Sequence, residues 1–266
     1  MPEGDTIRRA AAKLAPVLIG QVIHAAASRW PSVAFGLDGR TVSAIEPVGK
    51  HLWISLDDGQ AIRIHLGMHG KWRIGAPGTL RFSLGQVALR LELAEATVVC
   101  VGAPTVERTR DRLRPVHPVL TALGPDLLAD AIDLDQVVAR AAASGLPAIA
   151  EVLLDQTVAC GLGNVYQSEV LFVRRLHPFD PPAMLAESDW RALYTLGREL
   201  LQRNLGPGRR ITTPPGAPAP HWVYDRGGRP CLRCRASIES RVSGEGLPRR
   251  TWWCPNCQPP RPVRVP

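Results

Sequence analysis

Two cysteine pairs, Cys231-Leu232-Arg233-Cys234 and Cys254-Pro255-Asn256-Cys257, decide how the C-terminal region of the chain folds. Nineteen residues separate the pairs. Four thiolates at this spacing close a tetrahedral site across a hairpin, because each pair lies on its own tight turn. A redox C-x-x-C motif is the competing interpretation, but the motif occurs twice and no βαβ pattern surrounds either copy. We therefore expect one structural zinc ion (Zn2+), held by Cys231, Cys234, Cys254 and Cys257, in a hairpin domain over residues 222–258.

The region around the cysteines is strongly basic. Residues 221–266 contain nine arginines and three acidic residues, and the whole chain has 32 Lys and Arg against 24 Asp and Glu, a formal net charge of +8. Such a charge indicates a polyanionic partner, with nucleic acid favoured over a membrane surface. Four cysteines leave zinc no open coordination position, so the metal should stiffen the hairpin and take no part in catalysis.

The remaining composition excludes several classes of protein. Apolar residues make up 45% and charged residues 21% of the chain, as is usual for globular proteins. No run approaches the roughly 18 apolar residues that span a membrane, and the sequence from Met1 to Asp5 lacks the pattern of a secretory signal. We expect a monomeric cytosolic protein without membrane contact, in which the isolated Cys100 and Cys160 are buried core thiols.

The length of 266 residues predicts two domains. Residues 2–115 combine an amphipathic helix over Thr6–Leu18, capped by Thr6, with short β-rich runs between turn residues. These runs are Val33–Leu37, Thr41–Pro47, Leu52–Leu56, Ala61–His65, Lys71–Ile74 and Gln86–Leu93. They predict an antiparallel β-sandwich with the helix packed on it. The following Pro104–Pro118 has no periodicity and reads as a connector whose arginines touch an anion, or as a solvated loop.

Helical periodicity dominates residues 116–215. The expected helices are Leu134–Ala143, Ile149–Ala159, Asn164–Arg174 and Asp189–Asn204. Gly206–Pro220 is rich in Gly and Pro and should be an exposed, mobile loop. The predicted fold class is α+β, with two domains and a zinc-finger hairpin.

The amino terminus offers a nucleophile. Pro2 follows Met1, and removal of the methionine would expose a secondary amine. A terminal amine has a pKa near 8, about two units below that of lysine, so more of it is uncharged at neutral pH. Its attack on a sugar aldehyde gives an iminium ion without a protonation step. Glu3 beside it could act as general acid and base.

Four separated motifs cover nearly the whole chain: Met1-Pro2-Glu3-Gly4; Gly49-Lys50-His51-Leu52; Gly161-Leu162-Gly163-Asn164-Val165-Tyr166 with Glu169; and Arg249 leading into Thr251-Trp252-Trp253-Cys254-Pro255-Asn256-Cys257-Gln258. In order and spacing they resemble the formamidopyrimidine-DNA glycosylase and endonuclease VIII family, most of all its actinobacterial endonuclease VIII-like members. The resemblance implies a β-sandwich, a helix-two-turn-helix domain and a zinc hairpin, with damaged DNA between the domains. It implies a bifunctional DNA glycosylase/AP lyase of base excision repair in the bacterial cytosol or nucleoid.

The same resemblance implies roles for the catalytic residues. Pro2 is similar to the Schiff-base nucleophile and Glu3 to its proton donor. Lys50 matches the lysine assigned to proton transfer during β-elimination, although a lone lysine is normally a solvated charge. Arg249 matches the hairpin arginine that grips phosphate and assists δ-elimination.

The resemblance also implies contacts with DNA. Asn164 matches a phosphate-binding position, with a helix cap as the alternative, and Glu169 should anchor the geometry of the site. Met68 and His69 occupy the position of the wedge that fills the gap left by a flipped nucleotide, with ordinary packing as the alternative. Arg108 and Arg110 complete the expected DNA-binding residues.

Departures from the family pattern narrow the expected substrate. Thr6 stands where many relatives have a glutamate near the nucleophile, and Gly67 replaces a polar residue of some endonuclease VIII proteins. The Arg108 to Arg114 connector lacks the Arg-Phe-Gly wedge of the formamidopyrimidine branch, and Gly206–Pro220 shows little of the pattern with which that branch holds its flipped base. We therefore expect oxidised pyrimidines over 8-oxoguanine. The alternatives are a non-catalytic zinc-containing DNA-binding protein and an AP lyase that acts mainly on abasic or single-stranded DNA.

Overall fold

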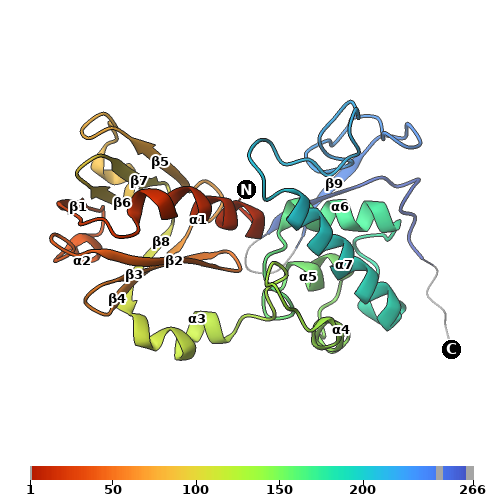
Figure 1. Ribbon diagram of the computed structural model, residues 1–266. Helices are drawn as coiled ribbons and strands as arrows, with labels where there is room; N and C mark the ends of the chain where they lie inside the picture. Colours follow the sequence, from red (N-terminus) through yellow and green to blue (C-terminus); the bar gives the residue numbers. More distant parts are fainter. Residues whose placement is uncertain (1, 244–247, 262–266) are drawn as a thin grey trace. The chain divides into compact units, whose positions relative to one another are not determined.

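The computed structural model describes residues 2–243 and 248–261 (Figure 1). The chain divides into two compact units, Met1–Ala122 and Leu123–Pro266, whereas the sequence analysis places this boundary after residue 115. Within the described ranges, no helix is both long and apolar enough to cross a membrane.

Unit 1 is the antiparallel β-sandwich that the sequence predicts. Helix α1 (Gly4–Leu18) buries one apolar face and begins before Thr6, so Glu3 and not Thr6 is its N-cap. Two four-stranded antiparallel sheets follow, with strand orders β2-β3-β4-β8 and β1-β6-β7-β5. Their strands are β1 (Ala25–Ala27), β2 (Val42–Val48), β3 (His51–Leu56), β4 (Gln60–His65), β5 (Lys71–Gly75), β6 (Val87–Glu92), β7 (Thr97–Val101) and β8 (Thr105–Arg110). The short 3-10 helix η1 (Leu84–Gln86) precedes β6.

The two sheets and α1 share one apolar core. Alternate residues of β3 and β4 point into it. They are Leu52, Ile54, Ile62 and Ile64, clustered with Leu89, Leu91 and Val98 of the second sheet and with Ile7, Leu14 and Leu18 of α1. This shared cluster explains why the helix and both sheets form a single unit.

The opposite face of the β2-β3-β4-β8 sheet is polar, and it is also covered. The 3-10 helix η2 (Asp111–Val116) and helix α3 (Pro118–Thr121) follow β8. The Asp111 carboxylate accepts hydrogen bonds from Trp53 Nε1 and Ser55 Oγ, both at 2.7 Å. The ring of His117, between η2 and α3, meets Trp53 edge-on at 5.8 Å. Because both faces of the sheet are covered, all six residues of β3 are buried.

Two segments of unit 1 correct the sequence analysis. The strand predicted over Val33–Leu37 is wrong, since helix α2 (Pro31–Ala34) begins there with Pro31 at a position where its missing N–H costs nothing. The Pro104–Pro118 connector is wrong in its first half, which is strand β8, paired with β4. Within β8 only Val106 joins the core cluster, so its charged neighbours concealed the strand.

Unit 2 begins with helices. Helices α4 (Leu134–Ala142), α5 (Ile149–Leu154), α6 (Asn164–Arg174) and α7 (Glu187–Arg203) pack around one apolar core. The short 3-10 helix η3 (Pro182–Met184) lies between α6 and α7 in the chain. Helix α6 has the predicted bounds. Helix α5 stops at Leu154 and not at Ala159, because the Asp155 carboxylate turns the chain by accepting from the N–H and the hydroxyl of Thr157, both at 2.8 Å.

The loop after α7, predicted to be mobile, is held by hydrogen bonds at its base. The Asn204 amide donates to the Ile211 carbonyl at 2.9 Å and accepts from the Ile211 N–H at 2.8 Å. The Thr212 N–H donates to the Pro220 carbonyl at 2.8 Å, and the Thr213 hydroxyl donates to the Ala219 carbonyl at 2.7 Å. Residues 212–220 therefore close into a short loop with a fixed base.

The unit ends in a small hairpin. Strand β9 (Glu239–Ser243) pairs antiparallel with β10 (Arg249–Trp253), and the turn 244–247 lies outside the described residues. Its own apolar cluster joins Phe172 of α6 with Val223, Ile238, Cys231 and Cys254. The Gln258 amide donates to the Leu176 carbonyl at 2.8 Å, which attaches the hairpin to the segment after α6.

Candidate active site and metal centre

The amino-terminal residues of unit 1 lie at the start of α1. Pro2 is half-buried and precedes Glu3, whose side chain is fully buried. The Glu3 carbonyl accepts the N–H groups of Thr6 at 2.9 Å and Ile7 at 3.1 Å, which opens the helix. A helix N-terminus carries partial positive charge, so the position favours a carboxylate beside the prolyl nitrogen.

Lys50 lies at the tip of a hairpin in the same unit. Val48 of β2 pairs with His51 of β3, so Gly49 and Lys50 alone form the turn. Gly49 has a positive φ of 54°, which glycine adopts without strain because it has no Cβ atom. The turn therefore fixes the backbone of Lys50 relative to β3.

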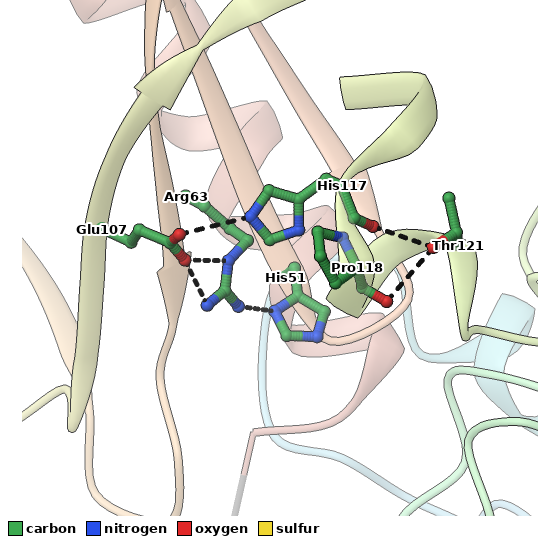
Figure 2. A network of polar contacts seen from close by, with 6 residues as sticks. All are labelled: His51, Arg63, Glu107, His117, Pro118 and Thr121. Atoms are coloured by element: carbon green, nitrogen blue, oxygen red, sulfur yellow. Dashed lines mark hydrogen bonds and ion pairs between the residues drawn. The ribbon is translucent and has the colours of Figure 1, made fainter. Parts of the chain in front are cut away.

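A chain of polar contacts starts at the next residue, His51, and crosses the outer face of the sheet (Figure 2). Arg63 of β4 contacts His51 Nδ1 at 3.0 Å through Nη1, and it donates to Glu107 of β8 through Nε at 2.9 Å and Nη2 at 2.7 Å. The other Glu107 oxygen lies 3.4 Å from His117 Nε2. The Thr121 hydroxyl lies within 3.1 Å of the His117 carbonyl and fixes the turn into α3.

These contacts change the ionisation of their members. Burial, together with the charges of His65, Arg63, His117 and Lys50, lowers the pKa of His51 to about 3. Burial opposes the charge of Glu107, but hydrogen bonds and positive charge from Arg63 and His117 outweigh it and lower the pKa of Glu107. The residue after Lys50 is therefore an uncharged imidazole, which contacts a guanidinium that is in turn paired with an ionised carboxylate.

The expected wedge residues lie in the turn between β4 and β5. Met68 is 57% exposed and His69 is also exposed. A Cβ atom on Gly67, which has a φ of +60°, would lie 2.6 Å from Pro104 Cγ, and one on Gly70 would lie 2.3 Å from the Leu66 carbonyl oxygen. The two glycines therefore allow a tight turn that presents Met68 at its tip.

Arg108 and Arg110 lie on strand β8, and the first has partners within unit 1. The Arg108 guanidinium donates to the Phe35 carbonyl and to the Gln60 side-chain oxygen. Arg110 is exposed. Of the two arginines that we expected to contact DNA, Arg110 thus has the greater solvent exposure.

Unit 2 places Asn164 against the hairpin. Asn164 is the first residue of α6 and Gly163 is the N-cap, and the buried Asn164 Oδ1 accepts no hydrogen bond from the described residues. Its amide Nδ2 instead donates to the Arg250 carbonyl of β10 at 2.7 Å. The helix-cap alternative is therefore wrong, and Asn164 fixes the strand that carries Arg249, a half-exposed residue.

Glu169 of α6 is fully buried and holds the beginning of the hairpin segment. Its carboxylate accepts from the backbone N–H groups of Trp222 at 2.8 Å, Val223 at 2.9 Å and Tyr224 at 2.9 Å, and from the Thr212 hydroxyl. Burial raises the pKa of Glu169, although these four donors act in the opposite direction. With both oxygens occupied from within the unit, Glu169 anchors the protein framework, and this geometry does not favour a direct contact with DNA.

The four paired cysteines converge. The sulfur atoms of Cys231, Cys234, Cys254 and Cys257 all lie within 4.8 Å of one another, with Cys231 to Cys257 at 3.9 Å and Cys234 to Cys254 at 3.4 Å. A tetrahedral zinc ion with Zn–S bonds of about 2.3 Å requires S···S separations of about 3.8 Å. Backbone N–H groups of Arg233 and Cys257 point at Cys231 Sγ and Cys254 Sγ, each at 3.4 Å. The donor set therefore fits one structural metal. Cys100 and Cys160 are buried apart from it, as predicted.

Comparison with known proteins identifies the family. Residues 1–105 match the formamidopyrimidine-DNA glycosylase N-terminal domain, and residues 123–214 match the formamidopyrimidine-DNA glycosylase H2TH domain. The chain belongs to the formamidopyrimidine-DNA glycosylase family. The predicted family and fold class are therefore confirmed.

Relatives within this family span the whole chain. A probable endonuclease 8 2 of Streptomyces coelicolor is 38% identical over 98% of this chain and 96% of its own length. The DNA-(apurinic or apyrimidinic site) lyase Nei2 of Mycolicibacterium smegmatis is 34% identical over 97% and 99%. The Lactococcus lactis Fpg protein, solved with a THF-DNA and an inhibitor, superposes with a TM-score of 0.83 at 24% identity, covering 97% of this chain and 100% of that one. The protein is thus a DNA glycosylase/AP lyase of base excision repair.

Sequence reasoning missed two sets of contacts made by or next to the candidate site residues. It did not find the Arg63–Glu107–His117 chain, although the alternation of His51, Trp53 and Ser55 with apolar residues signals a polar outer face on β3. It also did not find the bond from Asn164 to Arg250, since the two residues are 86 positions apart and no local pattern connects them.

Proposed function

We propose that this glycosylase excises oxidised pyrimidines through a Schiff base on Pro2 and then cleaves the strand by β,δ-elimination. The observation that carries the proposal is the position of Pro2 directly before the buried Glu3 at the start of α1. The prolyl nitrogen forms a bond to the sugar C1′ as the bond from C1′ to the base breaks. The resulting iminium ion acidifies the C2′ proton, whose removal expels the 3′ phosphate, and a second elimination expels the 5′ phosphate.

Glu3 and Lys50 move the protons of this sequence. Glu3 lies next to the nitrogen in the chain and protonates the sugar ring oxygen as C1′ opens. Lys50, held in the Gly49–Lys50 turn, exchanges a proton during elimination, which a guanidinium cannot do because it does not deprotonate in proteins.

Residues of unit 2 bind the DNA backbone in this proposal. Asn164 and the N–H groups at the start of α6 face a phosphate oxygen, and Arg249 binds a second phosphate in a bidentate manner. Zinc on the four cysteines would keep β10, and with it Arg249, in place. Glu169 supports the same hairpin from α6 through the backbone of residues 222–224.

Substrate choice follows from the wedge and from the relatives. Met68 enters the stack when the damaged nucleotide is flipped out, because an exposed and flexible apolar side chain can fill the gap. Relatives at 38% and 35% identity are named endonuclease 8, and the segment from Arg108 to Arg114 contains no Arg-Phe-Gly wedge. These observations favour oxidised pyrimidines over 8-oxoguanine.

A second candidate is an AP lyase that acts mainly on abasic or single-stranded DNA. The M. smegmatis relative bears the name DNA-(apurinic or apyrimidinic site) lyase, which favours this alternative. Excision of 5-hydroxyuracil and of 8-oxoguanine should be compared in duplex and in single strands, beside cleavage of a preformed abasic site. Faster cleavage of the abasic site with no excision from duplex would establish the second candidate.

Borohydride trapping tests the nucleophile. We expect a covalent adduct with abasic-site DNA at residue 2, because the iminium ion is reducible. Protein that retains an additional N-terminal residue, so that the proline nitrogen is acylated, should give no adduct while it still binds the DNA. Full trapping by the acylated protein would exclude Pro2 as the nucleophile.

A further inference from the structure

The turn that carries Lys50 leads directly into strand β3, whose first residue, His51, belongs to the polar outer face of the β2-β3-β4-β8 sheet. Cross-strand pairing places His51 opposite His65, and Arg63 between Trp53 and Glu107. Arg63 is only 6% exposed. Burying a guanidinium is costly unless its hydrogen bonds are made, and here Glu107 and His51 receive them (Figure 2).

The direction of the bond between Arg63 and His51 is fixed by chemistry. A guanidinium has no acceptor, so Arg63 Nη1 must donate and His51 Nδ1 must accept across their 3.0 Å separation. His51 is therefore an uncharged imidazole whose proton is on Nε2. The low pKa of His51 agrees with this state.

The same chemistry fixes the far end of the chain. Glu107 uses one oxygen for both bonds from Arg63, and its second oxygen accepts from His117 Nε2 at 3.4 Å. His117 begins the turn that Thr121 closes. This series of polar contacts therefore joins β3, β4 and β8 to the segment between η2 and α3. Arg63 contacts both His51 and Glu107 and so joins the two ends of this network.

We propose that Arg63 is a positioning residue for Lys50, which it serves by locking the adjacent His51 as an uncharged, Nε2-protonated imidazole. This inference rests on the proposed catalytic role of Lys50. The Arg63–His51 hydrogen bond fixes the side chain of the first residue of β3, and this residue closes one end of the two-residue Gly49–Lys50 turn. It also keeps a second positive charge away from the lysine when the pH falls.

The charged and titratable groups around His51 determine how easily its ring is protonated when Arg63 is replaced. They are Lys50 from its own turn, Arg63 and His65 from β4, and His117 from the segment over the sheet, with Glu107 of β8 behind Arg63. In an Arg63→Met variant, His51 loses the hydrogen-bond donor to Nδ1 and one neighbouring positive charge. The Arg63 guanidinium then no longer lies between His51 and the Glu107 carboxylate. Protonation of His51 then becomes easier than in the wild type, although burial, the largest cause of its low pKa, still holds that pKa below the ordinary value.

Nitrogen NMR of the His51 ring tests the lock without reference to activity. In the wild-type protein, Nδ1 should remain unprotonated and Nε2 protonated from pH 8 to about 5. In Arg63→Met the obligatory donor to Nδ1 is gone, so the proton should redistribute between Nδ1 and Nε2 and protonation should begin at a higher pH than in the wild type. Glu107→Gln, which retains the shape of the side chain, should give an intermediate result. A proton on Nδ1 in the wild type, or an unchanged ring in Arg63→Met, would overturn the inference.

Single-turnover cleavage of abasic-site DNA tests the connection to Lys50. Arg63→Met should lower the rate constant about tenfold, a loss typical of a displaced reacting group, with DNA affinity unchanged and a new ionisation in the pH profile. In the Lys50→Arg background the same change should have little further effect. Equal losses in both backgrounds would show that Arg63 does not act through Lys50.

Controls separate the possible failures. Arg90→Met removes another arginine of unit 1 that is paired with a carboxylate, Glu92, but in the other sheet, and it should leave the rate unchanged. Thermal unfolding establishes that each variant is folded, and Glu107→Gln replaces Arg63→Met if the latter is not. If Lys50→Arg alone cleaves like the wild type, the lysine assignment in the proposed function fails, whereas the NMR result on His51 still decides whether Arg63 sets its state.

Discussion

Lys50 is one of three lysines in a chain with 32 Lys and Arg residues. Where arginine satisfies almost every need for positive charge, a lysine at the tip of a two-residue turn indicates a task that a guanidinium cannot perform. Lys50→Arg should therefore keep the attraction for phosphate and slow strand cleavage by roughly 10²-fold or more, because loss of a proton-transfer group costs roughly 10²–10⁴-fold. Gel separation of intact and cleaved strands at one fixed salt concentration measures this.

His51 should make the stability of the protein depend on pH. Its pKa is about 3 in the folded state and about 6.5 when unfolded, so the unfolded chain binds the extra proton between these values. Stability is then fully present above about pH 6.5 and declines as the pH falls, by at most about 1.4 kcal/mol per pH unit from this group. Urea unfolding at pH 7 and pH 5 should show a smaller loss for His51→Gln than for the wild type. His24→Gln, which changes an exposed histidine, should lose as much as the wild type; equal losses for His51→Gln would contradict the assignment.

Helices and strands could be predicted from the sequence where the spacing of apolar residues alone determines them. The bounds of α6 and most strands of the first sheet follow from apolar periodicity. The β1 strand, Ala25–Ala27, was missed because alanine has low strand propensity and pairing with β6 alone defines it. The β8 strand was missed because its neighbours, rather than its own composition, make it a strand.

The candidate site shows the same division. The cysteine spacing predicted the convergence of four sulfur atoms, since ligand geometry restricts the chain locally. Arg63, Glu107 and His117 come from separate elements, and their contacts exist only after β4 and β8 pair and the following turn folds over them. Such tertiary contacts have no signature in a single sequence.

The zinc hairpin should act on DNA binding and not on the nucleophile. Cys254→Ser removes one of four ligands and should unfold the hairpin locally, because metal affinity supplies folding free energy to small sites. DNA affinity should fall, while borohydride adducts at saturating DNA should still form at Pro2. Arg249→Ala, with the metal intact, should weaken binding less and raise the share of β- over δ-elimination product. Metal analysis of purified protein provides the control; metal-free protein with normal DNA affinity would contradict the zinc assignment.

For the molecule as a whole, a formal net charge of +8 predicts binding that is dominated by phosphate contacts. The affinity for undamaged duplex should decline steeply as salt rises, and replacing one phosphate-contacting arginine should reduce the slope of log K against log salt by about 0.9. Arg110→Ala, which changes an exposed cation of β8, should show this reduction if Arg110 contacts DNA. Arg108→Ala, whose guanidinium already has partners in unit 1, serves for comparison. An unchanged slope for Arg110→Ala would remove it from the DNA-binding residues.

The sheet order of unit 1 has a consequence for self-association. An exposed edge strand is a template for pairing with another chain, and proteins oppose this with short strands, proline, irregular register or cations. Each edge here carries such a feature: β1 has three residues, β2 contains Pro47 and a register shift near Val42, β5 carries Lys71 and Arg73, and β8 carries Arg108 and Arg110. We therefore expect Arg108 and Arg110 to oppose strand addition at the β8 edge in addition to any contact with DNA. Concentrated protein should then sediment as a monomer, and replacing both arginines with valine should increase self-association.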